Sequence, residues 1–338
     1  MSSSYVKPNM KSLYYDKTLS QLPSLKGKTV AITGTTSGTG YVAARAIAHK
    51  GGRVVLLNRA SNKEKKSFEL LTKDFGPENF VRIECDLQSF ASVRSAAKQL
   101  ELLCPEGLDV LCNNAGIMAM QDKATVDGFD IQMQTNHLSH FLLTKELMPC
   151  LERAAESRGE ARVVNHSSIA RFMVSQLDPK YLEKRGGKLG GDGTRMMLFP
   201  QGRWLRYAQT KLANAAFTAC LYEKLNERES KVKALIAHPG LSSTDLQVTA
   251  LNDIGSGGWF MTQMMKMSQS QEDGALGIIV CIADPAVQSG DFIGPGAGKM
   301  AVKGPVTIFS LEPFYDNRET KDILWNKSCE AIGDKFDL

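Results

Sequence analysis

The chain has 338 residues, of which 43% are hydrophobic and 23% are charged. This composition is typical of an ordinary globular protein and excludes a disordered or fibrous chain, and the length is sufficient to bury a substantial core. The 41 basic and 36 acidic side chains leave a net charge of only +5, spread along the sequence. That balance argues against a nucleic acid as partner but is compatible with a phosphorylated ligand at one local site.

Residues 1–26 are polar and mixed, and they predict an N-terminal arm lying on a main domain that spans 27–338. The first residues lack the apolar core of a signal peptide, and no run approaches the roughly 18 apolar residues that would span a bilayer. The seven cysteines form no CxxC pair, so we expect buried free thiols rather than disulfides or a zinc site. These features predict a soluble protein of a reducing compartment, with a cytoplasmic location.

From Lys28 onward, short β-branched runs alternate with helix-length segments. The predicted strands are Thr29–Ile32, Val54–Leu57, Val81–Cys85, Val110–Leu111, Val163–Val164 and Val232–Ile236. Strands that alternate with helices favour βαβ units and a parallel sheet buried on both faces. We therefore predict the α/β class, as a single doubly wound Rossmann-type domain with a central parallel sheet and helices on both faces.

Two stretches interrupt this alternation, near residues 171–203 and 241–271. The first contains KRGGKLGGDG, whose glycines predict a mobile loop. The second contains SGGWFMTQMMKM, rich in aromatic and methionine side chains. Each stretch follows a predicted strand, so we expect both at the carboxyl edge of the sheet, where open α/β sheets bind ligands.

The first predicted strand runs into TGTTSGTG, which places Gly34, Ser37, Gly38 and Gly40 at the opening of a helix. Glycines allow a tight turn and a close approach of the backbone to a pyrophosphate, and the helix N-terminus presents free N–H groups to the phosphates. A plain strand–helix turn is the alternative. Because the turn follows the first strand of a βαβ unit, the sequence favours a dinucleotide site.

The end of the second predicted strand indicates which dinucleotide is bound. An NAD enzyme usually carries Asp or Glu there, about 20 residues past the glycine turn, to hold the ribose hydroxyls. This chain has Asn58 and Arg59 instead, with Lys63 close behind. A neutral amide does not repel a 2′-phosphate, and the planar guanidinium is suited to binding one. A solvated surface arginine is the alternative, and the pattern favours NADP.

Tyr207 and Lys211 are spaced four residues apart at the start of a strong helical pattern, so they share one helix face. A tyrosine normally titrates near 10, and lowering its pKa to about 7 requires about 4 kcal/mol of preferential stabilisation of the phenolate. A nearby lysine ammonium and an oxidised nicotinamide ring together can supply that stabilisation. The motif Tyr-x-x-x-Lys is common by chance, so its context decides its meaning.

Five motifs occur in one order along the chain: TGTTSGTG, NNAG from Asn113, HSS from His166, YAQTK from Tyr207 and HPG from His238. In order and approximate spacing the chain resembles the short-chain dehydrogenase/reductase family, from Lys28 to near the C-terminus. The glycine spacing and the segments QTNHLSHFLLT, YAQTKLANAAFT and ILWNKSCEAIG further resemble the retinol-dehydrogenase-like branch.

The resemblance implies a catalytic role for four residues. Tyr207 would be the general acid/base, and Lys211 would lower its pKa and bind the nicotinamide ribose. Ser168 would hydrogen-bond the substrate oxygen and share its developing charge. Asn136 would hold a water that relays protons to Lys211.

The resemblance also implies further contacts with the cofactor. Asp86 would meet the adenine edge, and the NNAG residues Asn113, Ala115 and Gly116 would lie beside the cofactor after the fourth strand. Pro239, Gly240 and Thr244 would line the nicotinamide and its carboxamide. The second interrupting stretch would form a lid over an apolar substrate through Trp259, Phe260, Met261, Met264, Met265 and Met267, with ordinary core as the alternative.

The chain departs from the family pattern at several points. Thr39 replaces the usual aliphatic residue between the last two glycines, and Tyr207 lies 39 residues after Ser168, a longer gap than usual. Because of this longer gap, the family resemblance does not identify the substrate. His137 and His140 are spaced like a metal pair but have no acidic or cysteine partner at suitable spacing, so we expect packed histidines and no metal.

These observations lead to one functional hypothesis and two alternatives. The hypothesis is an NADP(H)-dependent oxidoreductase that interconverts a lipophilic aldehyde or ketone and its alcohol by hydride transfer. The alternatives are a carbon–carbon double-bond reductase resembling protochlorophyllide reductase and a catalytically silent NADPH-sensing scaffold. We expect a small lipophilic carbonyl or alcohol as substrate, no nucleic acid and no transmembrane segment, and the family resemblance allows a homo-oligomer.

Overall fold

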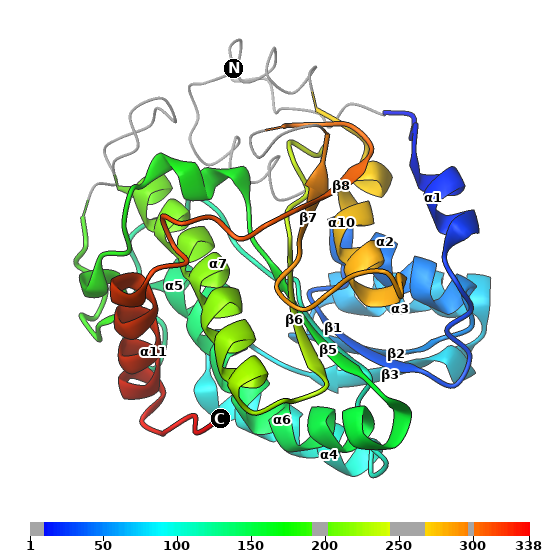
Figure 1. The fold of residues 1–338 in the computed structure, drawn as a ribbon, viewed down its shortest axis with the longest axis horizontal. Coiled ribbons are helices and arrows are strands. Elements are labelled where there is room, and N and C mark those ends of the chain that lie inside the picture. The colour runs from blue at the N-terminus through cyan, green and yellow to red at the C-terminus, as the bar shows by residue number, and fades with distance from the viewer. Residues whose placement is uncertain (1–9, 191–201, 244–267, 297–300) are drawn as a thin grey trace.

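A computed structural model gives the fold and describes residues 10–190, 202–243, 268–296 and 301–338. Its centre is one sheet with the strand order β3-β2-β1-β4-β5-β6-β7-β8 (Figure 1). The strands are β1 (Thr29–Thr33), β2 (Arg53–Asn58), β3 (Phe80–Glu84), β4 (Val110–Asn113), β5 (Ala161–His166), β6 (Val232–Ala237), β7 (Phe292–Pro295) and β8 (Val306–Phe309). Neighbouring strands from β3 to β7 are parallel, and β8 pairs antiparallel with β7.

The six predicted strands correspond to β1 to β6, which confirms the doubly wound α/β fold. Strands β7 and β8 were not predicted. β7 contains Gly294 and Pro295, which both weaken a strand pattern, and β8 has only four residues at a half-exposed edge. The predicted parallel sheet therefore gains one antiparallel edge strand.

Helices cover both faces of the sheet. They are α1 (Tyr15–Gln21), α2 (Gly38–His49), α3 (Asn62–Phe75), α4 (Phe90–Leu103), α5 (Ile131–Met133), α6 (Ser139–Arg158), α7 (Arg203–Glu227), α10 (Gln271–Ala283) and α11 (Arg318–Ile332). Alternate side chains of β2 enter different layers, because Val54 belongs to the apolar layer that includes α2 and α10, whereas Val55 belongs to the layer that includes α4, α6 and α7. This alternation explains why the four central residues of the strand, Val54–Leu57, are all apolar.

The N-terminal segment lies along α10 and α2. Tyr15 and Leu19 of α1 are buried in the same apolar layer as those helices, and so are Leu22 and Leu25 after it. The carboxylate of Asp273, in the first turn of α10, accepts hydrogen bonds from the backbone N–H groups of residues 13, 14 and 15 and from the hydroxyl of Ser12. Polar and apolar contacts therefore both hold residues 10–25 on the domain.

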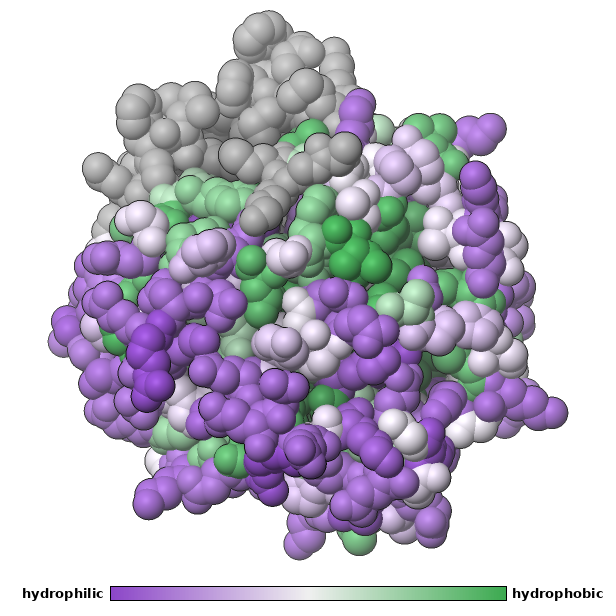
Figure 2. Space-filling model, in the orientation of Figure 1, coloured by the Kyte–Doolittle hydropathy of each residue, from purple (hydrophilic) through white to green (hydrophobic). Residues whose placement is uncertain are grey.

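Figure 2 shows hydrophilic residues over most of the lower part of one face, with hydrophobic residues gathered nearer the middle and top, close to α10. Of the helices that the structure describes, none has both the length and the apolar content needed to cross a membrane. Six cysteines are buried as free thiols and Cys329 is half-buried, as the sequence predicted.

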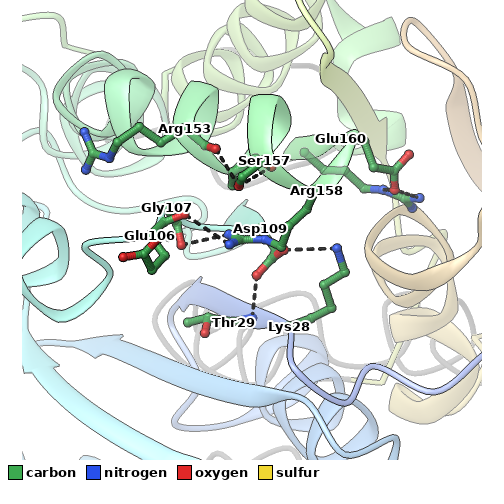
Figure 3. Close-up of polar contacts among 11 residues, drawn as sticks. Lys28, Thr29, Glu106, Gly107, Asp109, Arg153, Ser157, Arg158 and Glu160 are labelled. Atoms are coloured by element: carbon green, nitrogen blue, oxygen red, sulfur yellow. Dashed lines mark hydrogen bonds and ion pairs between the residues drawn. The ribbon is translucent and has the colours of Figure 1, made fainter.

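The amino edge of the sheet is held by a cluster of charges around Asp109, which precedes β4 (Figure 3). Its carboxylate accepts hydrogen bonds from the backbone N–H of Thr29 at 2.8 Å and from Arg158 Nε at 2.7 Å, and it pairs with Lys28 Nζ at 3.1 Å. These contacts tie the start of β1 to the end of α6. They lie at the edge opposite the predicted ligand site.

Candidate active site

Tyr207 and Lys211 both lie on the buried side of α7, one turn apart, and each is about 5% exposed or less. Ser168 follows β5 and caps the short 3₁₀ turn η3 (Ile169–Met173), where its Oγ accepts a hydrogen bond from Ala170 N at 3.2 Å. The Ser168 side chain lies close enough to Tyr207 to lower the pKa of its phenol. The structure therefore brings these three predicted residues together.

Lys211 is held by the end of β5. Its Nζ donates a hydrogen bond to the carbonyl oxygen of His166 at 3.0 Å and lies 5.7 Å from the centre of the Tyr207 ring. Burial lowers the pKa of Lys211 to about 8. The amine is therefore largely charged at neutral pH but can lose its proton in mildly alkaline solution.

The pKa of Tyr207 moves in the direction opposite to the one needed for proton transfer. Burial raises the pKa of Tyr207 to about 12, and the nearby Ser168 side chain lowers it only in part. Desolvation favours the neutral phenol because the phenolate loses its hydration. Within the chain alone, burial therefore outweighs the lowering that we expected from Lys211.

Asn136 lies in a π-helical turn, η2 (Gln134–Leu138), between α5 and α6. Such turns interrupt the regular ladder of helical hydrogen bonds and are frequent at functional sites. The Asn136 amide accepts from Ile117 N at 2.8 Å and donates to Ile117 O and to Thr210 Oγ1, both at 2.9 Å. A Cβ added at Gly116 would lie 3.3 Å from Asn136 Oδ1 and 3.5 Å from Lys211 Nζ. Gly116 thus borders both predicted residues.

The glycine-rich turn requires glycine at two positions for different reasons. Gly34 has φ +73°, and a Cβ there would lie 2.8 Å from the Cβ of Ala115. Gly40 has no room for a Cβ, which would lie 2.3 Å from both Asn114 Nδ2 and Gly34 O. The turn therefore packs directly against the NNAG segment.

The start of α2 is suited to bind an anion. Gly38 opens this 12-residue helix with φ +61°, and Ser37 at the N-cap makes no side-chain hydrogen bond to it. The first N–H groups of a helix have no intrahelical acceptor and carry the positive end of the helix dipole. Gly34, Ser37 and Gly38 are half-buried and so remain accessible. These residues fit the pyrophosphate of a dinucleotide.

Asn58 holds the glycine-rich turn from the end of β2. Its Oδ1 accepts a hydrogen bond from Thr35 N, and its Nδ2 donates one to Thr35 Oγ1, both at 2.8 Å. Arg59 is exposed and forms no ion pair with any residue that the structure describes. Its guanidinium is therefore available to a phosphate beside the turn.

The two asparagines of NNAG face different layers. Asn113 lies between β5 and α6, where its Nδ2 donates to Asn165 Oδ1 at 2.9 Å and to Thr144 Oγ1 at 3.0 Å. Asn114 faces the glycine-rich turn and donates to the carbonyl oxygens of Thr33 and Gly34. We did not single out Asn114 from the sequence. Its place in NNAG was the available signal, but only the fold shows that Asn114, just after β4, contacts the glycine-rich turn whereas Asn113 at the end of the strand does not.

Thr39 also contacts Asn114. Its hydroxyl donates to Asn114 Oδ1 at 3.0 Å, and the same oxygen lies 3.1 Å from His166 Nδ1. The hydroxyl of Thr39, which replaces the usual aliphatic side chain, thus has a hydrogen-bond partner within the protein. The sequence identified this departure but not its hydrogen-bond partner.

The remaining predicted cofactor residues occupy other loops. Asp86 is half-buried after β3, and its Oδ1 accepts from Gln88 N at 3.0 Å. Pro239 and Gly240 follow β6, and Gly240 has φ +62° with no room for a Cβ beside Val302 O. Thr244 lies outside the described residues, and so do the predicted lid residues Trp259, Phe260, Met261, Met264, Met265 and Met267.

An apolar cluster surrounds Tyr207. It contains Ala119, Ala170 and Trp204, with the partly buried Met118 and Met173 packed against it. Trp204 meets the Tyr207 ring edge-on, with 6.3 Å between ring centres. The cluster combines the NNAG loop, the turn after Ser168 and the start of α7. The side chain of Tyr207 is therefore in an environment suited to an apolar ligand.

The two histidines spaced like a metal pair, His137 and His140, are packed within the protein. His137 Nε2 lies 2.8 Å from Ser328 Oγ, and His140 Nε2 lies 2.9 Å from Thr33 Oγ1. Burial lowers the pKa of His137 to about 3 and that of His140 to about 4. Among the residues described, no three His, Cys, Asp or Glu side chains are grouped so that they could hold a metal ion.

Sequence comparison relates this chain to known dehydrogenases. A family profile for the short chain dehydrogenases matches residues 28–182. An uncharacterized oxidoreductase of Schizosaccharomyces pombe is 32% identical over 231 residues, which make up 68% of this chain and 64% of the yeast protein. The match thus spans less than two thirds of that relative. Polyprenol dehydrogenase of Mus musculus is 30% identical over 79% of this chain and 75% of its own length. Retinol dehydrogenase 13 of Homo sapiens is 33% identical over 66% of this chain and 61% of its own length.

Solved structures share the fold. The crystal structure of an uncharacterized protein from Mycobacterium Paratuberculosis is 29% identical and aligns over 98% of this chain and 100% of its own, with a TM-score of 0.72. An NADH complex of 3-ketoacyl-(acyl-carrier-protein) reductase from Brucella melitensis is 21% identical over 78% of this chain and 93% of its own, with a TM-score of 0.57. An NADPH-bound carbonyl reductase from chicken fatty liver is 20% identical over 80% and 97%, with a TM-score of 0.56. By sequence and by fold, the chain belongs to the short-chain dehydrogenase/reductase family.

Proposed function

We propose that this protein is an NADP(H)-dependent oxidoreductase that interconverts a lipophilic aldehyde or ketone and its alcohol. The observation that carries the proposal is the proximity of Ser168 to Tyr207, which lies in an apolar cluster, with Lys211 one turn away on α7. A proton donor, a second hydroxyl for the carbonyl oxygen and a cation meet there, as carbonyl reduction requires. The relatives named for polyprenol and retinol, both lipophilic alcohols, support an apolar substrate.

The residues present fit a nicotinamide dinucleotide. The start of α2 and the glycine-rich turn would hold its pyrophosphate, Arg59 would bind a 2′-phosphate, and Lys211 would bind the nicotinamide ribose. When bound, the cofactor supplies the hydride in reduction and, in its oxidised form, a positive charge near the phenol.

In reduction, Ser168 Oγ donates a hydrogen bond to the carbonyl oxygen and orients it toward Tyr207. Tyr207 then gives its phenolic proton to that oxygen while the carbonyl carbon becomes an alcohol carbon. The Lys211 ammonium stabilises the resulting phenolate, because its pKa of about 8 leaves it charged at neutral pH. The surrounding apolar side chains exclude water and so strengthen these electrostatic interactions.

The test measures NADPH and NADH oxidation with purified protein and a panel of aldehydes and ketones of increasing chain length. Replacing Tyr207 with Phe should lower turnover by about 100-fold or more while NADPH still binds. Tyr222→Phe, farther along α7, is the matched control and should keep full activity. Tight NADPH binding without turnover on any carbonyl would contradict the proposal and favour the double-bond reductase or the silent sensor.

The cytoplasmic location and a homo-oligomeric state stay predictions.

A further inference from the structure

Arg171, three residues after Ser168, has a wholly buried side chain. Its guanidinium forms a two-pronged ion pair with Glu312, through Nε to Oε2 at 2.7 Å and through Nη2 to Oε1 at 3.0 Å. Its third nitrogen, Nη1, donates to the carbonyl oxygen of Ser168 at 3.1 Å. One guanidinium therefore joins the carboxylate to the backbone of Ser168.

Two aromatic rings flank this guanidinium. Its central carbon lies 4.1 Å from the ring centre of Phe172 and 4.3 Å from that of Phe292. Both distances are suited to cation–π contact. The backbone N–H of Arg171 also donates to the Ser168 carbonyl oxygen at 3.1 Å. The same carbonyl thus accepts two hydrogen bonds from one residue.

Stability alone is a weak explanation for a pair of charges at this depth. A buried ion pair often contributes no more to stability than two apolar side chains of similar volume, because both ions lose their hydration. What such a pair does provide is a defined geometry for the groups that it contacts. Here that group is the backbone of Ser168, whose side chain lies near Tyr207 and which precedes Ala170 of the apolar cluster around that tyrosine.

We infer that Arg171 and Glu312 are positioning residues for the reaction, which hold the turn after β5 so that Ser168 Oγ faces both Tyr207 and the substrate oxygen. Glu312 comes from the segment between β8 and α11, which lies 141 residues away in the sequence. The C-terminal segment thereby sets the geometry of the active site without touching the substrate. This inference rests on the role proposed for Ser168.

Two variants separate positioning from stability. Arg171→Lys keeps a positive charge for Glu312 but cannot hold the carboxylate and the Ser168 carbonyl through one planar group. The double variant Arg171→Met/Glu312→Leu removes both charges and keeps apolar volume, so it should unfold at a temperature close to that of the wild type. In both variants we expect kcat with decanal and NADPH to fall about 10-fold to 100-fold, as misplacement of a reacting group by about 1 Å does. The Kd for NADPH, measured by fluorescence, should change less than about 2-fold, since neither residue lies at the glycine-rich turn.

The controls distinguish a failure of the positioning role from a failure of the role proposed for Ser168. Asp109→Asn alters an ion-pair network at the opposite edge of the sheet (Figure 3) and should lower the unfolding temperature without changing kcat. If the double variant keeps wild-type kcat while Ser168→Ala is inactive, the positioning role is overturned and the proposed function stands. If Ser168→Ala itself keeps wild-type kcat, the role proposed for Ser168 fails, and the positioning inference fails with it.

Discussion

Asn58 and Thr35 exchange two hydrogen bonds of 2.8 Å, which attach the glycine-rich turn to the end of β2. The amide is buried, so it serves the turn directly rather than lying at the surface. An aspartate at position 58 could accept hydrogen bonds from the same N–H and hydroxyl groups. Replacing Asn58 with Asp therefore introduces a negative charge with little change in the shape of the side chain.

Asn58→Asp should reverse part of the expected preference for NADPH. The carboxylate would repel a 2′-phosphate and accept hydrogen bonds from free ribose hydroxyls, so the ratio of kcat/KM for NADPH to that for NADH should fall at least about 10-fold, or about 1.4 kcal/mol. Steady-state kinetics with both cofactors measure the ratio. Asn226→Asp, an exposed change near the end of α7, should leave it unaltered. An unchanged ratio in Asn58→Asp would contradict the assignment of this site.

Arg59→Ala should weaken NADPH binding selectively. The side chain is exposed and unpaired with the described residues, so its removal should cost the fold little. We expect the KM for NADPH to rise about 10-fold and that for NADH to stay within about 2-fold. Arg228→Ala, exposed after α7, is the control. Equal changes for both cofactors would show that Arg59 does not recognise the 2′-phosphate.

Lys211 predicts an alkaline limit to activity. Its pKa is lowered to about 8 by burial, so its ammonium is present below that pH and is lost above it. The reductive kcat/KM should therefore decline above about pH 8, with circular dichroism confirming that the fold persists. A rate that stays constant to about pH 10 would mean that the charge is not needed.

The lowered pKa of Lys211 also makes the stability of the fold depend on pH. The folded pKa of Lys211 lies below its ordinary value of 10.5, so the unfolded chain holds the proton more tightly between these values. Its contribution to the unfolding free energy should therefore rise as the pH increases from about 8 to about 10.5 and stay constant below about 8. Denaturant unfolding of the wild type and of Lys211→Met at several pH values isolates this contribution. Identical pH dependences in the two proteins would contradict it.

Gly34→Ala should damage both the fold and the cofactor site. The residue has φ +73°, and a Cβ would lie 2.8 Å from Ala115 Cβ. We expect a loss of about 1–3 kcal/mol in unfolding free energy, together with loss of NADPH binding. Gly159→Ala is a close control, since Gly159 has φ +89° but nothing within 4 Å of its added Cβ. NADPH binding that falls equally in both variants would rule out a specific role for the Gly34–Ala115 contact.

Asp273→Asn should loosen the N-terminal segment. The carboxylate accepts four hydrogen bonds from residues 12–15, and an amide nitrogen cannot accept those made to the oxygen that it replaces. We expect a decrease of about 1.5–3 kcal/mol in unfolding free energy and faster hydrogen exchange in residues 12–22. Asp16→Asn, an exposed change in α1, should produce less than about 1 kcal/mol. Wild-type exchange rates in Asp273→Asn would show that apolar packing alone holds the segment.

Local patterns were sufficient for the sheet core and for the family. The apolar runs at Val54–Leu57 and Val232–Ile236 predicted central strands, and TGTTSGTG predicted the turn, because hydrophobic periodicity and the glycine requirement of a tight turn are properties of short segments. The spacing of Tyr207 and Lys211 predicted that they share a helix face, the family resemblance added Ser168 to their site, and the structure brings the three residues together. These parts of the protein were determined by the sequence alone.

Only the tertiary structure decided the rest. β8 pairs antiparallel at an edge where a short strand gives little signal. Asn114, the first residue after β4, holds the glycine-rich turn, whereas Asn113 at the end of that strand contacts Asn165 and Thr144. Burial, a property of the whole core, raises the pKa of Tyr207 to about 12 against the local expectation. Arg171 meets Glu312 across 141 residues, and no short pattern contains both. Contacts between distant segments depend on how complete layers pack, so they cannot be read from the spacing of residues along the chain.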